Sequence, residues 1–152
     1  MKLSHFSPKP LLDLYARKQI DYERKLFAYK PEGLWLSVDG EDDWKTWARE
    51  NRFRLENMRY RYRITLDDDP CVLHLTSPSG LHEFEKVFGA EDGITSFPAI
   101  DWQKVAELYS GIIIAPYQWR CRMNMMWYYG WDCASGCIWD VSVIKSFKRI
   151  KL

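Results

Sequence analysis

The segment YRYRITL, residues 60–66, restricts the fold more than any other part of the chain, because it alternates strictly between two kinds of side chain. Aromatic and aliphatic residues occupy every second position, and Arg61 and Arg63 stand between them. Successive side chains of a β-strand point to opposite faces. We therefore expect an amphipathic strand with one buried face, which is typical of an antiparallel sheet.

Other segments predict further strands and helices around this one. Apolar or alternating runs indicate strands at 3–6, 33–38, 71–75, 112–117 and 137–144, and apolar residues at helical spacing indicate helices at 11–29, 40–53, 78–89 and 100–111. The expected helix caps are Asp42 or Asp43, Ser79 and Asp101. Strands and helices follow one another without a regular βαβ rhythm. The predicted fold class is α+β, with a mixed, mainly antiparallel sheet and flanking helices.

The composition narrows the classes of function. A chain of 152 residues predicts a single domain, 1–152, and a net charge of +1 provides no global field that would attract nucleic acid or an anionic membrane. Aromatic residues make up 16% of the chain, and such a surplus is common at binding clefts. We find neither a signal peptide nor a long apolar run, and the four cysteines suit a reducing compartment. We expect no membrane contact and a cytoplasmic location.

The segment MWYYGWDCASGCIWDV, residues 126–141, carries the densest set of chemically useful side chains. Cys133 and Cys137 form one C-x3-C pair, whereas a structural zinc site usually has two close ligand pairs, so we expect no metal. Neither thiol has a base beside it in the sequence, and both fit small buried residues better than nucleophiles. Asp132 lies among aromatic residues, where a carboxylate is costly to bury unless it is paired. It is a candidate catalytic acid, and a turn or cap aspartate is the alternative.

Three short motifs in this order resemble the ADP-ribosyltransferase superfamily, in its branch with a His–aromatic–acid site. They are HFSP with His5, KPEGLWLS with Trp35 and Ser37, and WDCASGCIWD with Asp132. Within this branch, the chain resembles small phage-encoded members that act against bacterial defence, of the anti-CRISPR type. The resemblance implies a split sheet, NAD as the substrate that supplies ADP-ribose, and a macromolecular acceptor, with protein favoured over nucleic acid.

The same resemblance implies roles for individual residues. The catalytic residues would be Asp132 and His5, and the NAD-binding residues would be His5, Ser7, Trp35, Ser37, Trp47 and Tyr129. Cleavage of the nicotinamide–ribose bond passes through an oxocarbenium-like state, which a nearby carboxylate stabilises. The chain departs from the branch in two places, since Trp35 stands where tyrosine is common and Asp132 where glutamate is common.

Other functions remain open at the level of sequence. Surplus aromatic residues and the arginines of residues 49–63 could form a non-catalytic surface for a protein or for single-stranded nucleic acid. An NAD glycohydrolase would use the same pocket with water as the acceptor. A cysteine hydrolase would need a base that the fold brings to a thiol.

Overall fold

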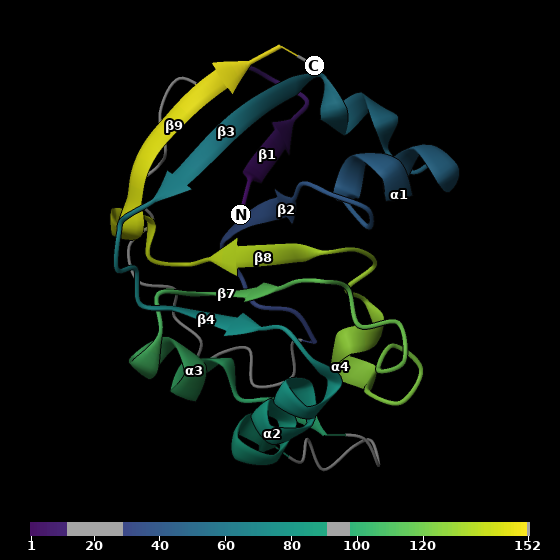
Figure 1. Ribbon diagram of the computed structural model, residues 1–152, viewed down its shortest axis with the longest axis vertical. Coiled ribbons are helices and arrows are strands. Elements are labelled where there is room, and N and C mark those ends of the chain that lie inside the picture. Colours follow the sequence, from purple (N-terminus) through teal and green to yellow (C-terminus); the bar gives the residue numbers. More distant parts are fainter. Residues whose placement is uncertain (12–28, 91–97, 152) are drawn as a thin grey trace.

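The computed structural model describes residues 1–11, 29–90 and 98–151, and these form a seven-stranded sheet in the order β4-β7-β8-β2-β1-β3-β9 (Figure 1). Every neighbouring pair is antiparallel except β4 and β7, which are parallel. The predicted fold class, α+β with a mixed and mainly antiparallel sheet, is confirmed at this level.

The strands of this sheet are β1 (Leu3–Ser7), β2 (Leu34–Val38), β3 (Tyr60–Leu66), β4 (Val72–Leu75), β7 (Gly111–Ile114), β8 (Ser135–Ile138) and β9 (Ile144–Ile150). A small separate sheet joins β5 (Gly89–Ala90) and β6 (Ala99–Ile100). The helices are α1 (Trp44–Glu50), α2 (Pro78–Phe88), α3 (Trp102–Leu108) and α4 (Met126–Tyr129), with 3-10 turns η2 (Leu55–Met58) and η3 (Val141–Val143). Within the described residues, no helix has the length and apolar character needed to cross a membrane.

Strand β3 has the two faces that its alternation predicts. Tyr62 and Ile64 are buried on one side. On the other side Arg61 Nη2 and Arg63 Nη1 donate to Oδ2 of Asp39, at 2.8 and 2.6 Å. The strand pairs antiparallel with β1 on one edge and with β9 on the other. The polar face of β3 is therefore bonded to the loop that follows β2.

Strands β1 and β2 stay together only briefly. Their paired residues are Leu3 with Val38 and Ser4 with Ser37, whereas β1 remains paired with β3 along its whole length. Figure 1 shows β1, β3 and β9 steeply inclined to β2, β8, β7 and β4. The sheet therefore opens between β1 and β2 beyond Ser4.

Apolar residues fill both faces of the sheet. On one face α2, α3 and α4 pack over β7 and β8, with Phe84, Trp102 and Trp127 at the centre of the contact. The opposite face holds a smaller cluster that includes Leu36, Tyr62 and Ile138. Neighbours in β8 alternate between the two clusters, since Cys137 belongs to the first and Ile138 to the second. The buried run of this strand is thus explained by a sheet that is covered on both sides.

Two sequence-based expectations need correction. The continuous strand expected at 137–144 is broken, because Oδ1 of Asp140 accepts hydrogen bonds from the backbone N–H and the hydroxyl of Ser142 and so forms the turn η3. The cap of α2 is Ser77 rather than Ser79, since the Ser77 hydroxyl accepts from Gly80 N at 3.1 Å. Asp43 and Asp101 cap α1 and α3 as expected. The helix expected at 11–29 falls almost wholly outside the described residues.

Candidate functional site

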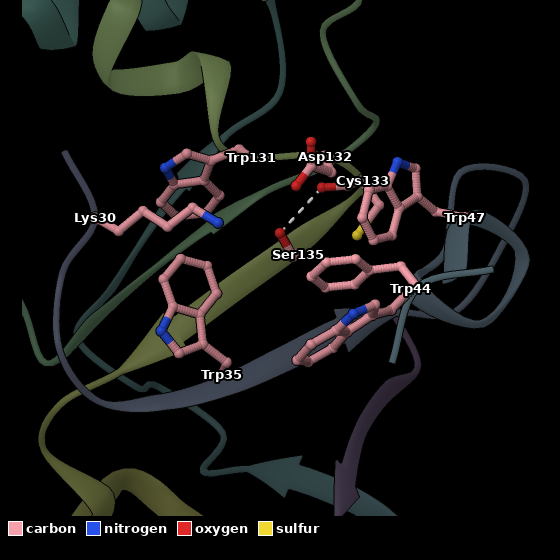
Figure 2. Close-up of a pocket in the computed structure, with 9 residues that line it drawn as sticks. Lys30, Trp35, Trp44, Trp47, Trp131, Asp132, Cys133 and Ser135 are labelled. Carbon is pink, nitrogen blue, oxygen red and sulfur yellow. Dashed lines mark hydrogen bonds between the residues drawn. The ribbon is translucent and has the colours of Figure 1, made fainter. Parts of the chain in front are cut away.

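A pocket of about 270 Å³ lies where β2, α1 and the start of β8 meet (Figure 2). Its walls are mainly aromatic, with an ammonium, a carboxylate, a thiol and a hydroxyl among them. The lining residues are Lys30, Trp35, Trp44, Trp47, Phe53, Trp131, Asp132, Cys133 and Ser135. Figure 2 shows two groups of rings facing each other, with Trp35 and Trp131 on one side and Trp44 and Trp47 on the other.

The two sides are held by hydrogen bonds at the start of α1. Ser37 is buried in β2, and its hydroxyl accepts from Trp44 N at 3.0 Å. Asp43 caps the helix by accepting from Thr46 N at 2.8 Å. Ala134 N donates to the Asp42 carbonyl at 2.8 Å, which joins the segment before β8 to the same helix end. The pocket walls are therefore fixed to one another through backbone groups.

Asp132 provides the carboxylate of the pocket. Its Oδ1 accepts from Arg122 Nη2 at 2.9 Å, and its side chain keeps 29% of its surface exposed. The Arg122 guanidinium also lies over the ring of Tyr129, 5.3 Å from the centroid. The ion pair thus holds one oxygen of the carboxylate, while the exposed part of the group can still face a ligand.

Of the seven residues that the sequence predicts for the site, three line the pocket and four do not. Asp132, Trp35 and Trp47 all line the pocket. Ser37 positions α1 from behind it. Tyr129 is exposed and contacts Arg122, so it lies next to the pocket rather than in its wall.

Residues His5 and Ser7 of β1 do not line the pocket. The Ser7 hydroxyl donates to the Lys9 carbonyl at 2.6 Å within a local turn. His5 Nδ1 lies 2.8 Å from the carbonyl oxygen of Trp35, so that ring N–H donates across the opening between β1 and β2. His5 therefore contacts the backbone of a lining residue, Trp35, and does not itself line the pocket.

Several lining residues were absent from the sequence-based prediction. Trp44 shares a helix face with Trp47, and Trp131 precedes Asp132, so both could have been found from spacing. Lys30 carries no local signal for a place in the pocket. Phe53 follows α1 closely and packs against Trp47, with ring centroids 5.3 Å apart. Cys133, which the sequence predicts as a small buried residue, and Ser135 complete the lining.

The thiol that lines the pocket, Cys133, is a poor nucleophile in this setting. Cys121, Cys133 and Cys137 are buried and reduced, and Cys71 is exposed. Burial raises the pKa of Cys133 to about 12, with the Asp132 charge adding to the effect and Lys30 opposing it. A thiol with such a pKa carries almost no thiolate at neutral pH. In the described part of the chain, no group of three or more His, Cys, Asp or Glu side chains could hold a metal ion.

Replacing His5 with alanine should lower the free energy of unfolding by about 1–2 kcal/mol, because the half-buried Trp35 carbonyl loses its side-chain donor. Asparagine can present an amide N–H near the position of Nδ1 and should recover part of this loss. Urea unfolding of the three proteins measures the difference. Equal stability of the alanine variant and the wild type would contradict this role of His5.

Burial lowers the pKa of His5 below its usual value, and the Trp35 hydrogen bond opposes this only in part. His5 therefore binds its proton at a higher pH in the unfolded chain than in the folded chain. The stability contributed by neutral His5 is complete above about pH 6.5 and is lost as the pH falls through the lowered pKa. The wild type should lose more stability between about pH 7.5 and 5.5 than the His5→Asn variant, whose remaining histidines are the same.

Comparison with known proteins gave no match: no family model, no curated protein and no solved structure is significantly similar to the chain.

Proposed function

We propose that the chain is an NAD⁺-dependent mono-ADP-ribosyltransferase that breaks the nicotinamide–ribose bond and transfers ADP-ribose to a macromolecular acceptor. The observation that carries the proposal is the partly exposed Asp132 carboxylate in a pocket walled by indole rings. A protein acceptor is favoured over nucleic acid, and a phage origin with action in the host cytoplasm belongs to the same proposal.

The pocket suits the nicotinamide end of NAD⁺. Its volume of about 270 Å³ lies just below the range for drug-sized ligands, which fits one substituted ring rather than the whole dinucleotide. The oxidised ring is a pyridinium cation, and cations are attracted to the faces of indoles. Trp35 on one side and Trp44 or Trp47 on the other supply such faces.

Asp132 is then in a position to assist the bond cleavage. The electron pair of the bond between the ribose C1′ and the ring nitrogen passes to that nitrogen, so neutral nicotinamide leaves and positive charge develops on the ribose. A carboxylate near C1′ stabilises this charge. The acceptor nucleophile then bonds to C1′, and its proton passes to Asp132 or to solvent. Tryptophan at position 35 keeps the stacking face that tyrosine would provide but has no hydroxyl.

The opening between β1 and β2 supports a split sheet of the ADP-ribosyltransferase type. β1 leaves β2 beyond the Ser4–Ser37 pair, and His5 lies at this opening with Nδ1 bonded to the Trp35 carbonyl. With its N–H at Nδ1, the neutral ring has an acceptor at Nε2. We propose an ADP-ribosyltransferase-like split sheet in which Nε2 accepts a hydrogen bond from a ribose hydroxyl.

A non-catalytic binding module is the second candidate. Four large apolar side chains are exposed in or beside the segment that joins β7 to β8, namely Trp119, Met123, Met126 and Tyr129. Exposed apolar residues that lie close together are common in protein interaction sites.

Incubation of the protein with NAD⁺ labelled in its adenylate part and with a bacterial lysate separates these candidates. The proposed transferase should place label on a macromolecule, and heating in denaturant should leave that label in place. Free labelled ADP-ribose without labelled macromolecule would indicate an NAD glycohydrolase. Unconsumed NAD⁺ would contradict both enzymes and favour the binding module.

A further inference from the structure

Lys30 brings a positive charge into the pocket proposed for a cationic ring. Its Nζ lies over the ring of Trp35, 5.2 Å from the centroid. Figure 2 shows the ammonium pointing between Trp131 and Trp35, into the space that the rings enclose. A cation already occupies one aromatic face of this pocket, and any ligand there must accommodate it.

Gly130 leaves room for the side chain of Lys30 in this position. A Cβ atom added at Gly130 would lie 2.9 Å from Cε of Lys30 and 3.7 Å from its Nζ. The absence of a side chain at position 130 thus leaves room for the lysine stem beside the segment that carries Trp131 and Asp132. Lys30 itself remains an exposed residue, so its ammonium can shift when a ring enters.

The Asp132 carboxylate acts on the charge of Lys30 and is also paired with Arg122. Loss of hydration lowers the pKa of Lys30, and the Asp132 carboxylate is the largest influence that opposes this change. Asp132 is also bonded to Arg122. The ammonium is set among the indoles that would hold the ring, while the carboxylate is held by Arg122, so the two charges can act on different parts of a ligand.

We infer that Lys30 discriminates between the two charge states of the nicotinamide ring, disfavouring the bound pyridinium cation relative to the neutral ring that leaves. This inference rests on the proposed function. During cleavage the ring loses its positive charge and the ribose gains it. Repulsion by Lys30 is therefore present in the ground state and falls away as the bond breaks, while attraction by Asp132 grows. Only interactions that change between these two states accelerate the chemical step.

Other roles of Lys30 predict different affinities for the cationic and the neutral ring. If Lys30 only donates a hydrogen bond to the carboxamide group, it strengthens the binding of both rings, since both carry that group. If it only packs against Trp35, a long apolar side chain replaces it without changing selectivity. The ratio of affinities for a cationic and a neutral ring is therefore the diagnostic quantity.

The experiment compares 1-methylnicotinamide, which is a cation, with neutral nicotinamide. Binding of each is followed by calorimetry with the wild type, Lys30→Met, Lys30→Arg and Lys148→Met. Methionine keeps an unbranched chain without the charge, and arginine keeps the charge. Lys148 is an exposed residue of β9 that does not line the pocket, so its variant controls for a general loss of positive charge.

The Lys30→Met variant should bind the cation about tenfold more tightly and nicotinamide with little change, an effect in the range of one charge pair near a protein surface. Lys30→Arg and Lys148→Met should keep the wild-type ratio. In turnover, Lys30→Met should lower both kcat and KM for NAD⁺, as removal of ground-state destabilisation does. Circular dichroism checks that each variant is folded, and Lys30→Gln replaces Lys30→Met if that variant is not.

An unchanged ratio of the two affinities in Lys30→Met would overturn the inference, and so would an equal loss of affinity for both rings. If neither ring binds to the wild type or to any variant, the inference and the proposed function both fail. If the ratio changes as expected but NAD⁺ is not consumed, charge discrimination by Lys30 stands and only the proposed function fails.

Discussion

Replacing Asp132 with alanine should lower NAD⁺ turnover by about 10²–10³-fold, the usual cost of losing one preorganised electrostatic contact to a transition state. The carboxylate is part of the pocket, and its pairing with Arg122 fixes its orientation. Its removal takes away the stabilisation of the positive ribose while the indole walls remain. The effect should therefore appear in kcat, with KM for NAD⁺ changed much less.

Three further variants separate the charge from the structure. Asp132→Asn keeps an acceptor for Arg122 but removes the charge, and it should be nearly as inactive as the alanine variant. Arg122→Ala tests whether the ion pair matters only for positioning, and it should lose less activity than either. Asp68→Ala removes an exposed carboxylate paired with Lys145 and should leave turnover unchanged. Turnover of Asp132→Ala at the wild-type rate, measured by release of nicotinamide, would exclude Asp132 as the catalytic acid.

The stability cost of Asp132→Ala should be small. Both partners of its ion pair are partly exposed, with 24% of Arg122 and 29% of Asp132 accessible. Pairs of this kind contribute about 1 kcal/mol or less. A large fall in melting temperature would therefore show that Asp132 holds the segment before β8 in place, and it would weaken the kinetic interpretation.

Local patterns in the sequence predict the regular elements well, because periodicity reflects which face is buried. The alternation in β3 and the spacing of Trp44 and Trp47 in α1 both describe real faces. The break at Asp140 is not predictable in this way. A polar residue between Trp139 and Val141 looks the same whether it faces solvent from a strand or caps a turn, and only its hydrogen bonds with Ser142 decide between them.

The candidate site depends on register between strands distant in sequence. β2 pairs with β8 so that Trp35 lies opposite Cys137 and Ser37 opposite Ser135. This register brings Asp132 to the end of β2 where α1 begins, but no local pattern fixes it, because a strand can pair in several registers until one face is buried. Lys30 illustrates the same limit, since it meets Gly130 only after β2 and β8 are joined.

Replacing Trp35 with alanine should weaken NAD⁺ binding by about 30-fold or more, which corresponds to the roughly 2 kcal/mol lost when a central aromatic anchor is truncated. The Trp35 ring packs against Trp131 with centroids 4.9 Å apart and lies beneath the Lys30 ammonium. Its loss removes one face of the proposed nicotinamide site, while Trp131 keeps its contacts with Trp127 and Tyr128. Calorimetry is the suitable measurement, because removing a tryptophan changes the fluorescence signal itself.

Aromatic replacements at position 35 test whether stacking is the reason for this loss. Trp35→Phe and Trp35→Tyr keep a flat apolar face and should bind NAD⁺ within a few-fold of the wild type, and the tyrosine variant adds a hydroxyl to that face. Trp119→Ala is the matched control, since Trp119 is 56% exposed and does not line the pocket. The Trp35 carbonyl that accepts from His5 is retained in every variant, so the opening between β1 and β2 keeps its hydrogen bond. Equal affinities in Trp35→Ala and Trp119→Ala would mean that the nicotinamide ring does not bind against Trp35.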